Sequence, residues 1–189
     1  MGSESDGTSP QSLYALVIYL PHPLGAFLDD LRLEMVPGCS PHAHVSVLPP
    51  RPLPVAPDAA IEEARQIVAG FAPFEIGLGR IEKFAATDVI YIAVEDGNRE
   101  LREMHRSLNR GALSFAEPFA YHPHVTLAQE IAAHQVDPLL ALADRRWSEF
   151  PGRRRFRAST AVFVRNLRGN YWIDLAEGSL RGLPAGPLD

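Results

Sequence analysis

The 189-residue sequence lacks most features that would place it in a membrane or an oxidising compartment. It has a single cysteine, Cys39, so no disulfide can form within the chain, as is usual in a reducing cytoplasm. No apolar run approaches the roughly 20 residues needed to cross a bilayer. Residues 1–11 are polar and lack the apolar core of a signal peptide, which predicts a flexible tail. We therefore expect a cytoplasmic protein with no membrane partner.

The chain also lacks an excess of basic charge. It has 18 Lys and Arg residues against 23 Asp and Glu residues, a formal net charge of -5. Proteins that grip long nucleic acids do so with a basic surface, because the phosphate backbone dominates the affinity. The composition therefore argues against a long nucleic acid as partner. A nucleotide or a short RNA end remains compatible with it as a substrate.

What the sequence does contain is an alternation of short apolar runs and stretches with helical spacing. Apolar residues make up 46% of the chain, which is enough for a buried core. The patterns predict strands near residues 13–20, 44–47, 74–78, 89–94, 124–127, 156–164 and 171–175. They predict helices near residues 24–35, 61–71, 101–108 and 137–150.

The order of these elements repeats, which indicates an internal duplication. The matching positions are 17–19 with 89–91, His44 with His124, and Phe74 with Phe156. We expect an α+β protein in which two pseudo-symmetric halves form two antiparallel sheets facing a central cleft, with helices on the outside. Residues 12–176 would form this single bilobal domain, followed by a C-terminal tail over 177–189. Because both halves come from one chain, we expect a monomer.

Each half offers one imidazole and one hydroxyl on the same surface. Residues two apart in a strand point to the same face, so His44 lies beside Ser46 and His124 beside Thr126. Two facing pairs of this kind suit a phosphodiester. One neutral histidine takes a proton from the attacking hydroxyl and the other, protonated, gives one to the leaving oxygen. The hydroxyl groups can hold the non-bridging phosphate oxygens.

These motifs resemble those of the two-histidine (2H) phosphoesterase superfamily, and within it the 2′-5′ RNA ligase-like branch. The resemblance lies in HVSVLPPR at residues 44–51, FEIGLGRIEKF at 74–84 and PHVTLA at 123–128. The order of elements agrees over roughly residues 13–175. The chain departs from the branch at Ser46, where threonine is commoner, and at Gln129, where many relatives have a basic residue.

The resemblance implies a metal-independent hydrolase that needs no cofactor. His44 and His124 correspond to the family's catalytic histidines, and Ser46 and Thr126 to its phosphate-binding hydroxyls. The implied reaction is the opening of a 2′,3′-cyclic phosphate on an RNA end or a small nucleotide, a cyclic phosphodiesterase activity. Some members of the family also join RNA ends through 2′-5′ bonds in the reverse direction.

Other residues have two readings each from sequence. His42 and His122 precede the motif histidines by two residues and either support the motif histidines from behind or are polar edge residues. Tyr19 and Tyr91, at matching places in the halves, could stack a base or fill the core. His105 lies on the apolar side of its helix and is predicted to be a core or boundary residue. The basic run with Arg153, Arg155 and Arg157 could contact phosphates or form a solvated edge.

Two rival functions come from other classes of protein. A nucleotide-binding protein of the same fold could lack catalysis while keeping both motifs. A metal site could instead use the two His-x-His pairs, although no carboxylate or cysteine stands beside them. The sequence leaves open the natural substrate, whether ligation occurs, and which histidine is the acid.

Overall fold

The computed structural model describes residues 12–40, 42–168 and 171–183. The tail predicted for residues 1–11 lies outside this range, as do residues 184–189 of the tail predicted over 177–189. Residues 177–179 instead belong to the last strand, and Leu180 is 4% exposed and part of the core, so the fold continues past residue 176. The elements follow in the order β1 (Tyr14–Tyr19), α1 (Leu24–Met35), β2 (His44–Arg51), α2 (Pro57–Ala69), β3 (Phe74–Lys83), β4 (Ile90–Val94), α3 (Asn98–Leu108), β5 (His124–Ala128), α4 (Val136–Ser148), β6 (Arg155–Ala158), β7 (Thr160–Arg168) and β8 (Tyr171–Ser179).

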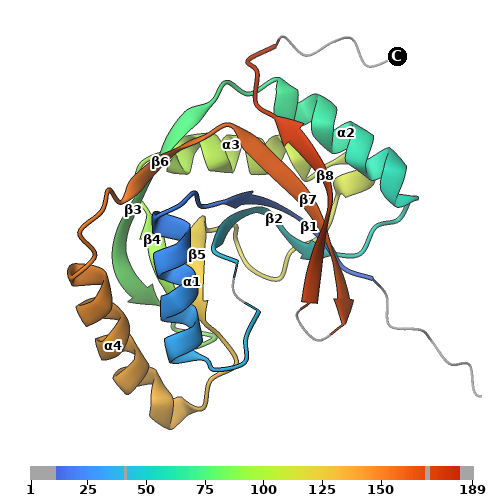
Figure 1. The fold of residues 1–189 in the computed structure, drawn as a ribbon. Helices are drawn as coiled ribbons and strands as arrows, with labels where there is room; N and C mark the ends of the chain where they lie inside the picture. Colours follow the sequence, from blue (N-terminus) through green and yellow to red (C-terminus); the bar gives the residue numbers. More distant parts are fainter. Residues whose placement is uncertain (1–11, 41, 169–170, 184–189) are drawn as a thin grey trace, which may run out of the picture.

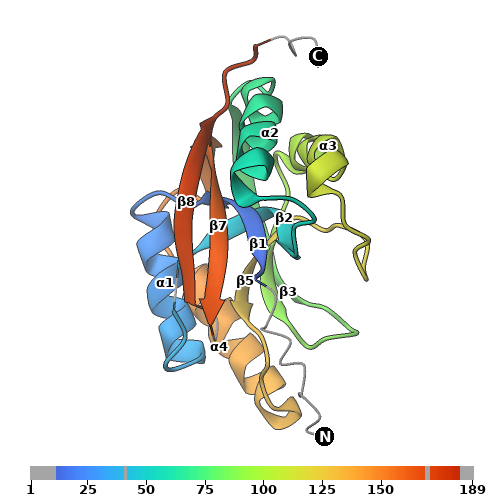
Figure 2. The same ribbon diagram turned by 90° about the vertical axis from the view of Figure 1, so that its right-hand side faces the viewer.

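The strands form two four-stranded antiparallel sheets, in the orders β2-β1-β7-β8 and β5-β4-β3-β6. The helices lie in two pairs, α1 with α4 and α2 with α3 (Figures 1 and 2). Helix α1 also contacts β5, α4 contacts β3, α3 contacts β2 and α2 contacts β8. The predicted α+β architecture with two antiparallel sheets is confirmed. Within the described residues, no helix is long and apolar enough to cross a membrane.

The two sheets are not built from two consecutive halves of the chain, because the halves exchange a strand. The single strand predicted over residues 156–164 is in fact two strands, β6 and β7, separated at Ser159. Strand β6 pairs with β3 in one sheet, and β7 pairs with β1 in the other. Phe156 of β6 stands opposite Ile76 of β3. Because β3 and β6 are neighbours in one sheet, they are not matching strands of the two halves, and the predicted equivalence of Phe74 and Phe156 is wrong. The apolar pattern runs through the break, because both segments bury one face in the same core.

The ladders also correct the register of the duplication. In the first sheet Tyr19 stands opposite His44 and Val17 opposite Ser46. In the second sheet Ala93 stands opposite His124, and Tyr91 opposite Thr126. Tyr91 therefore corresponds to Val17 and not to Tyr19. The sequence VIY occurs at both 17–19 and 89–91, and matching these letters shifts the two strands by two residues from their true correspondence. A shift of two residues keeps each side chain on the same face of its strand.

One apolar core joins the helices to one face of both sheets. Val45 and Val47 of β2 and Val125 and Leu127 of β5 are at most 1% exposed and belong to it. The alternate residues of the same strands, which carry the imidazoles and hydroxyls, are only partly buried on the other face. Because a slip of one residue would exchange the two sets, burial of the aliphatic residues holds the polar ones on the open face.

Candidate functional site

Strands β2 and β5 bring the two motifs together. Each is the outer strand of its sheet, and the two strands contact one another. His44 and His124 are close enough that a positive charge on His124 lowers the pKa of His44. Ser46 and Thr126 lie on the same partly buried faces as the histidines that they follow. The four residues of the two motifs therefore lie on two neighbouring strands.

Both histidine rings are held in the same way by a backbone carbonyl. Nδ1 of His44 lies 2.6 Å from the carbonyl oxygen of His42, and Nδ1 of His124 lies 2.6 Å from that of His122. A carbonyl oxygen only accepts, so each Nδ1 carries the hydrogen and donates it. Each Nε2 is left to exchange a proton with a substrate. Residues 42 and 122 thus orient the motif histidines through their backbones, which sequence reasoning about side chains missed.

The two imidazoles differ in their electrostatic surroundings. Burial lowers the pKa of His44 to about 4, against the raising effect of its hydrogen bond to the His42 carbonyl, and nearby Arg32 lowers it further. Burial also lowers the pKa of His124, again against its bond to the His122 carbonyl. The cationic Arg32 thus distinguishes the first histidine, which is the more strongly held in its neutral form.

Aromatic rings stand beside both histidines on the open face. Tyr19 stacks on His42 with ring centroids 3.5 Å apart, and its hydroxyl donates to Asp174 at 2.6 Å. Tyr91 donates to Glu82 at 2.9 Å. The ring of Phe84 stacks on Tyr91 at 4.1 Å, and these two rings lie 5.1 and 5.2 Å from the His124 ring. The two tyrosines face the site and do not point into the main core.

The basic residues of β6 lie away from the motif strands. Arg155 donates to Asp96 at 2.9 Å, and Arg157 stands opposite Glu75. Both arginines are exposed, and β6 is at the opposite edge of its sheet from β5. Their surroundings favour the reading of a solvated edge. Gln129 is exposed just after the end of β5.

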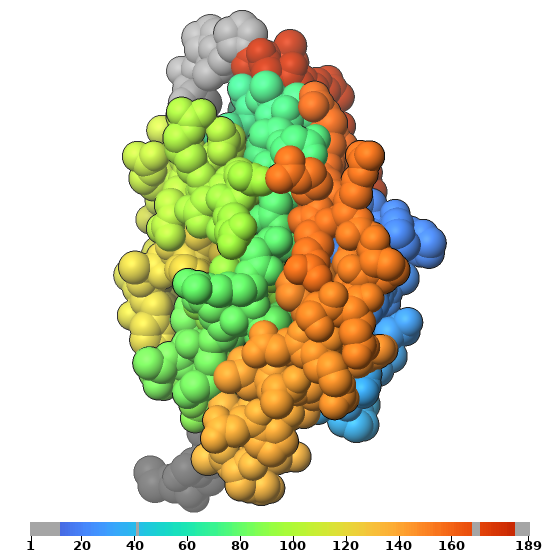
Figure 3. All heavy atoms as spheres, turned by 90° about the vertical axis from the view of Figure 1, so that its left-hand side faces the viewer, coloured from blue at the N-terminus to red at the C-terminus, as the bar shows by residue number. Residues whose placement is uncertain are grey.

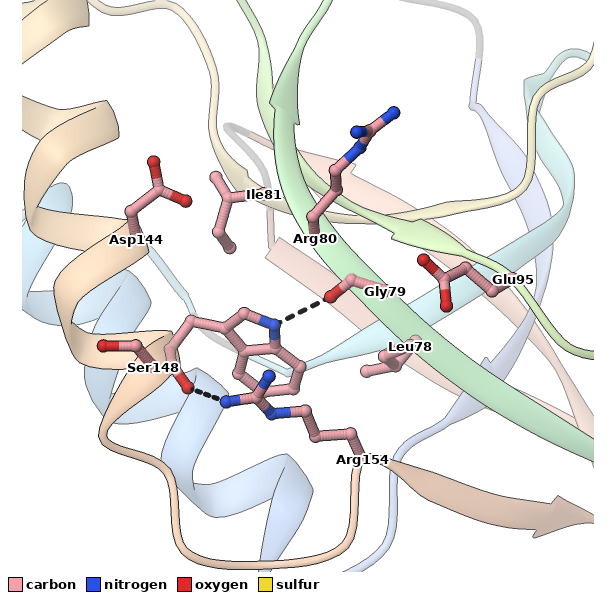
Figure 4. Close-up of a pocket in the computed structure, with 9 residues that line it drawn as sticks. Leu78, Gly79, Arg80, Ile81, Glu95, Asp144, Ser148 and Arg154 are labelled. Carbon is pink, nitrogen blue, oxygen red and sulfur yellow. Dashed lines mark hydrogen bonds between the residues drawn. The ribbon is translucent and has the colours of Figure 1, made fainter.

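A cavity of about 360 Å³ lies elsewhere, between β3 and α4. Trp147 lines it and donates to the carbonyl of Gly79 at 2.8 Å, with Arg154 stacked 4.5 Å from the Trp147 ring (Figure 4). Figure 3 shows this face of the molecule, with β3 in green beside α4 in orange. None of the predicted site residues lines the cavity. Among the described residues, no three His, Cys, Asp or Glu side chains gather as a metal site would require.

Two like sheets, each presenting a His-x-Ser/Thr strand at its edge, are the architecture of a two-histidine phosphoesterase. The chain belongs to the 2′-5′ RNA ligase superfamily, whose family model matches residues 21–170.

Two curated relatives carry the name of a phosphoesterase. One, OB1230 of Oceanobacillus iheyensis, is 28% identical over 81 residues, which cover 42% of this chain and 47% of the relative. The other, Bcer98_0945 of Bacillus cytotoxicus, is 29% identical over 98 residues, which cover 47% of this chain and 56% of the relative. The chain thus spans about half the length of the curated relatives that it matches.

Solved structures share the fold at low sequence identity. LigT of E. coli in complex with 3′-AMP has a TM-score of 0.61 and 18% identity, covering 91% of this chain and 99% of that one. The apo form of LigT has a TM-score of 0.59 and 19% identity, covering 92% and 99%. Usb1 of Kluyveromyces marxianus has a TM-score of 0.50 and 17% identity, covering 87% and 96%.

Proposed function

We propose that this protein is a metal-independent phosphodiesterase that opens the 2′,3′-cyclic phosphate of a small nucleotide or a short RNA end. The proposal rests on one observation above all. Two histidines on touching edge strands both donate through Nδ1 to a carbonyl two residues earlier, which leaves both Nε2 atoms for a substrate. An oriented pair of imidazoles can supply a base and an acid to one phosphodiester.

In the proposed reaction His44 is the general base. Its Nε2 takes a proton from a water molecule whose oxygen forms a bond to phosphorus. The bond from phosphorus to the 2′- or 3′-oxygen breaks, and the leaving oxygen receives the proton of His124. The product is a phosphomonoester beside a free hydroxyl. Proximity of Arg32 supports this assignment, since a cation disfavours a second positive charge on His44.

The surroundings of His124 support its role as the acid. The rings of Phe84 and Tyr91 lie within about 5 Å of the imidazole, and aromatic faces attract a cation. An anionic phosphate bound beside the ring would further favour the imidazolium. Ser46 and Thr126 would donate their hydroxyl hydrogens to the non-bridging oxygens as negative charge develops.

The aromatic rings also support a nucleotide as the substrate. Planar rings beside the two motifs would offer stacking surfaces for a base. LigT of E. coli, which shares the fold, has been solved with 3′-AMP and with phosphate. Of these ligands, 3′-AMP is a phosphomonoester of the kind that the proposed reaction produces.

Phosphorus NMR on a panel of substrates tests the proposal. Nucleoside 2′,3′-cyclic phosphates and a short RNA with a cyclic phosphate end should each yield one monoester, and EDTA should not slow the reaction. Adding an RNA with a free 5′-hydroxyl shows whether the reverse 2′-5′ ligation occurs. Binding of nucleotides without turnover would instead support the non-catalytic alternative. Activity that EDTA abolishes and a metal restores would support the metal site.

A further inference from the structure

A buried cluster of charged and polar side chains holds the end of β2 to the segment that leads into β5. Arg51 is the last residue of β2 and only 1% exposed, although it is a cation. It forms an ion pair with Glu117, in the segment between the short 3₁₀ turn at Gly111–Leu113 and β5. Three further hydrogens of the guanidinium go to the Pro49 carbonyl at 3.0 Å, to Asn109 at 2.7 Å and to the Leu113 carbonyl at 2.9 Å.

The cluster continues to the backbone of the first motif. Glu117 lies 3.5 Å from Nε2 of His105, and the His105 ring stacks on Tyr121 at 3.9 Å and 5°. The hydroxyl of Tyr121 donates to the Ser46 carbonyl at 2.8 Å, while Nδ1 of His105 lies 2.9 Å from the Val47 carbonyl. Two consecutive carbonyls of β2, the outer strand of its sheet, are therefore bound by side chains from beyond the sheet.

Tyr121 also belongs to the approach to the second motif. The next residue is His122, whose carbonyl receives the hydrogen of Nδ1 of His124. Arg102 of α3 binds the Tyr121 carbonyl at 2.7 Å, so this residue is held at both its side chain and its backbone. Burial raises the pKa of the Tyr121 phenol, which keeps the hydroxyl a donor. One side chain thus links the backbone of Ser46 to the residue before the His124 anchor.

We infer that Tyr121 is a positioning residue, which sets the spacing of His44 and His124 with Arg51, Glu117 and His105 as its buried support. The inference rests on the proposed function, because it concerns the geometry of that reaction. Buried ion pairs stabilise a fold little compared with apolar residues of the same volume, so stability alone is a weak reason for this cluster. Precise spacing of two proton-transfer groups is a stronger one, because a displacement of about 1 Å can cost about 10²-fold in rate.

Tyr121→Phe tests the inference, since it keeps the ring that stacks on His105 and removes the bond to Ser46. We expect kcat to fall by about 10- to 10²-fold, with KM changed much less. Tyr171→Phe is the matched control, because Tyr171 is 57% exposed on β8, and it should keep wild-type kcat and KM. Glu117→Gln is a second variant that loosens the support, and we expect a smaller fall in kcat in the same direction.

An activity-independent measurement separates this inference from the proposed function. NMR titration measures the pKa values of the His44 and His124 rings. These values should change in Tyr121→Phe, because the electrostatic influence of the rings on one another changes, and should not change in Tyr171→Phe. A lower melting temperature together with wild-type kcat per folded molecule would overturn the positioning role. If the wild-type protein turns over no cyclic phosphate, the proposed function fails, and the ring titrations still decide: titrations unchanged by Tyr121→Phe would overturn the inference.

Discussion

At the scale of single residues, the two motif histidines differ in ways that their identical spacing conceals. Both rings donate through Nδ1 to a carbonyl at 2.6 Å. His44 is near Arg32, whereas His124 is flanked by the rings of Phe84 and Tyr91. The pair is therefore chemically unequal, which allows the roles of base and acid to be tested separately.

A substrate with a good leaving group should distinguish the two roles. On a nucleoside 2′,3′-cyclic phosphate, His44→Ala and His124→Ala should each cost about 10²–10⁴-fold in rate, and the double variant little more. On bis(4-nitrophenyl) phosphate, 4-nitrophenolate leaves without a proton. His124→Ala should then recover much of its loss in kcat, while His44→Ala should not.

His42→Ala and His122→Ala are the controls for this experiment. Both variants retain the backbone carbonyl that holds the motif histidine, so both should stay close to wild-type rates. Recovery by His44→Ala in place of His124→Ala would reverse the assignment. Equal recovery by both variants would mean that neither histidine is specialised.

The dependence of kcat/KM on pH should follow from the lowered pKa values. The base must be neutral, so the rate should rise as pH increases through about 4, where His44 loses its proton. The acid must be protonated, so the rate should fall again as pH increases and His124 loses its proton. Because the pKa of His124 is also lowered, this alkaline fall should be centred at a pH lower than 6.5, the ordinary histidine value. Arg32→Gln removes a cation that opposes protonation of His44, so the acid limb should move to higher pH.

A control for this profile is Arg99→Gln, since Arg99 is 85% exposed on α3 and is absent from the causes that shift the pKa of His44. It should leave both limbs in place. An acid limb at pH 6.5 in the wild-type protein would contradict the effect of burial on His44.

At the scale of elements, β2 and β5 can present their motif residues because each strand has one aliphatic and one polar face. The aliphatic face enters the main core, which also receives α1 and α4. Helix α1 contacts β5 and α4, and it also carries Arg32. The helix that packs beneath the second motif thus brings a charge to the first one.

Truncation of a core residue in α1 should show how much the helix contributes to stability. Leu28 is 0% exposed, so Leu28→Ala should lower the free energy of unfolding by about 2–5 kcal/mol. Leu33, on the outer side of the same helix, is 42% exposed, and Leu33→Ala should change it by less than about 0.5 kcal/mol. Urea denaturation measures both. A similar loss in the two variants would mean that α1 is not packed as described.

At the scale of the whole molecule, the exchange of β3 and β7 between the halves joins them into one body. Strand β3 comes from the first half of the chain but pairs in the sheet that carries the second motif. Strand β7 comes from the second half but pairs in the sheet that carries the first motif. The main apolar core spans both sheets. The two motif strands are therefore positioned by shared packing as well as by the cluster around Arg51.

The net charge of the whole chain predicts a weak dependence of substrate binding on salt. With a formal charge of -5, a cyclic-phosphate substrate should be held by a few local contacts and not by a broad basic surface. The logarithm of the binding constant should fall with the logarithm of salt concentration with a slope of about 1 to 3. Titration calorimetry at several salt concentrations measures it. A slope typical of many phosphate contacts would contradict a substrate held only locally.

The polar and apolar faces of the two motif strands could be predicted from local sequence alone. Alternation in His44–Val47 and His124–Leu127 is local, so it predicts which side chains share a face without knowledge of the partner strand. The sequence also placed His105 on the apolar side of its helix as a core or boundary residue, and the structure buries it at 7% exposure. The helix over residues 24–35 was predicted correctly because its apolar spacing and Pro37 are local too.

Features that depend on contacts between distant parts of the chain could not be predicted in this way. The break at Ser159, the register of Tyr91 against Thr126 and the link from Tyr121 to Ser46 are set by which strands meet. Two strands of like composition can pair in registers that differ by two residues, since the same faces stay buried. Shape and hydrogen bonding across the packed sheets select one of these registers, so the register cannot be predicted from the local sequence pattern.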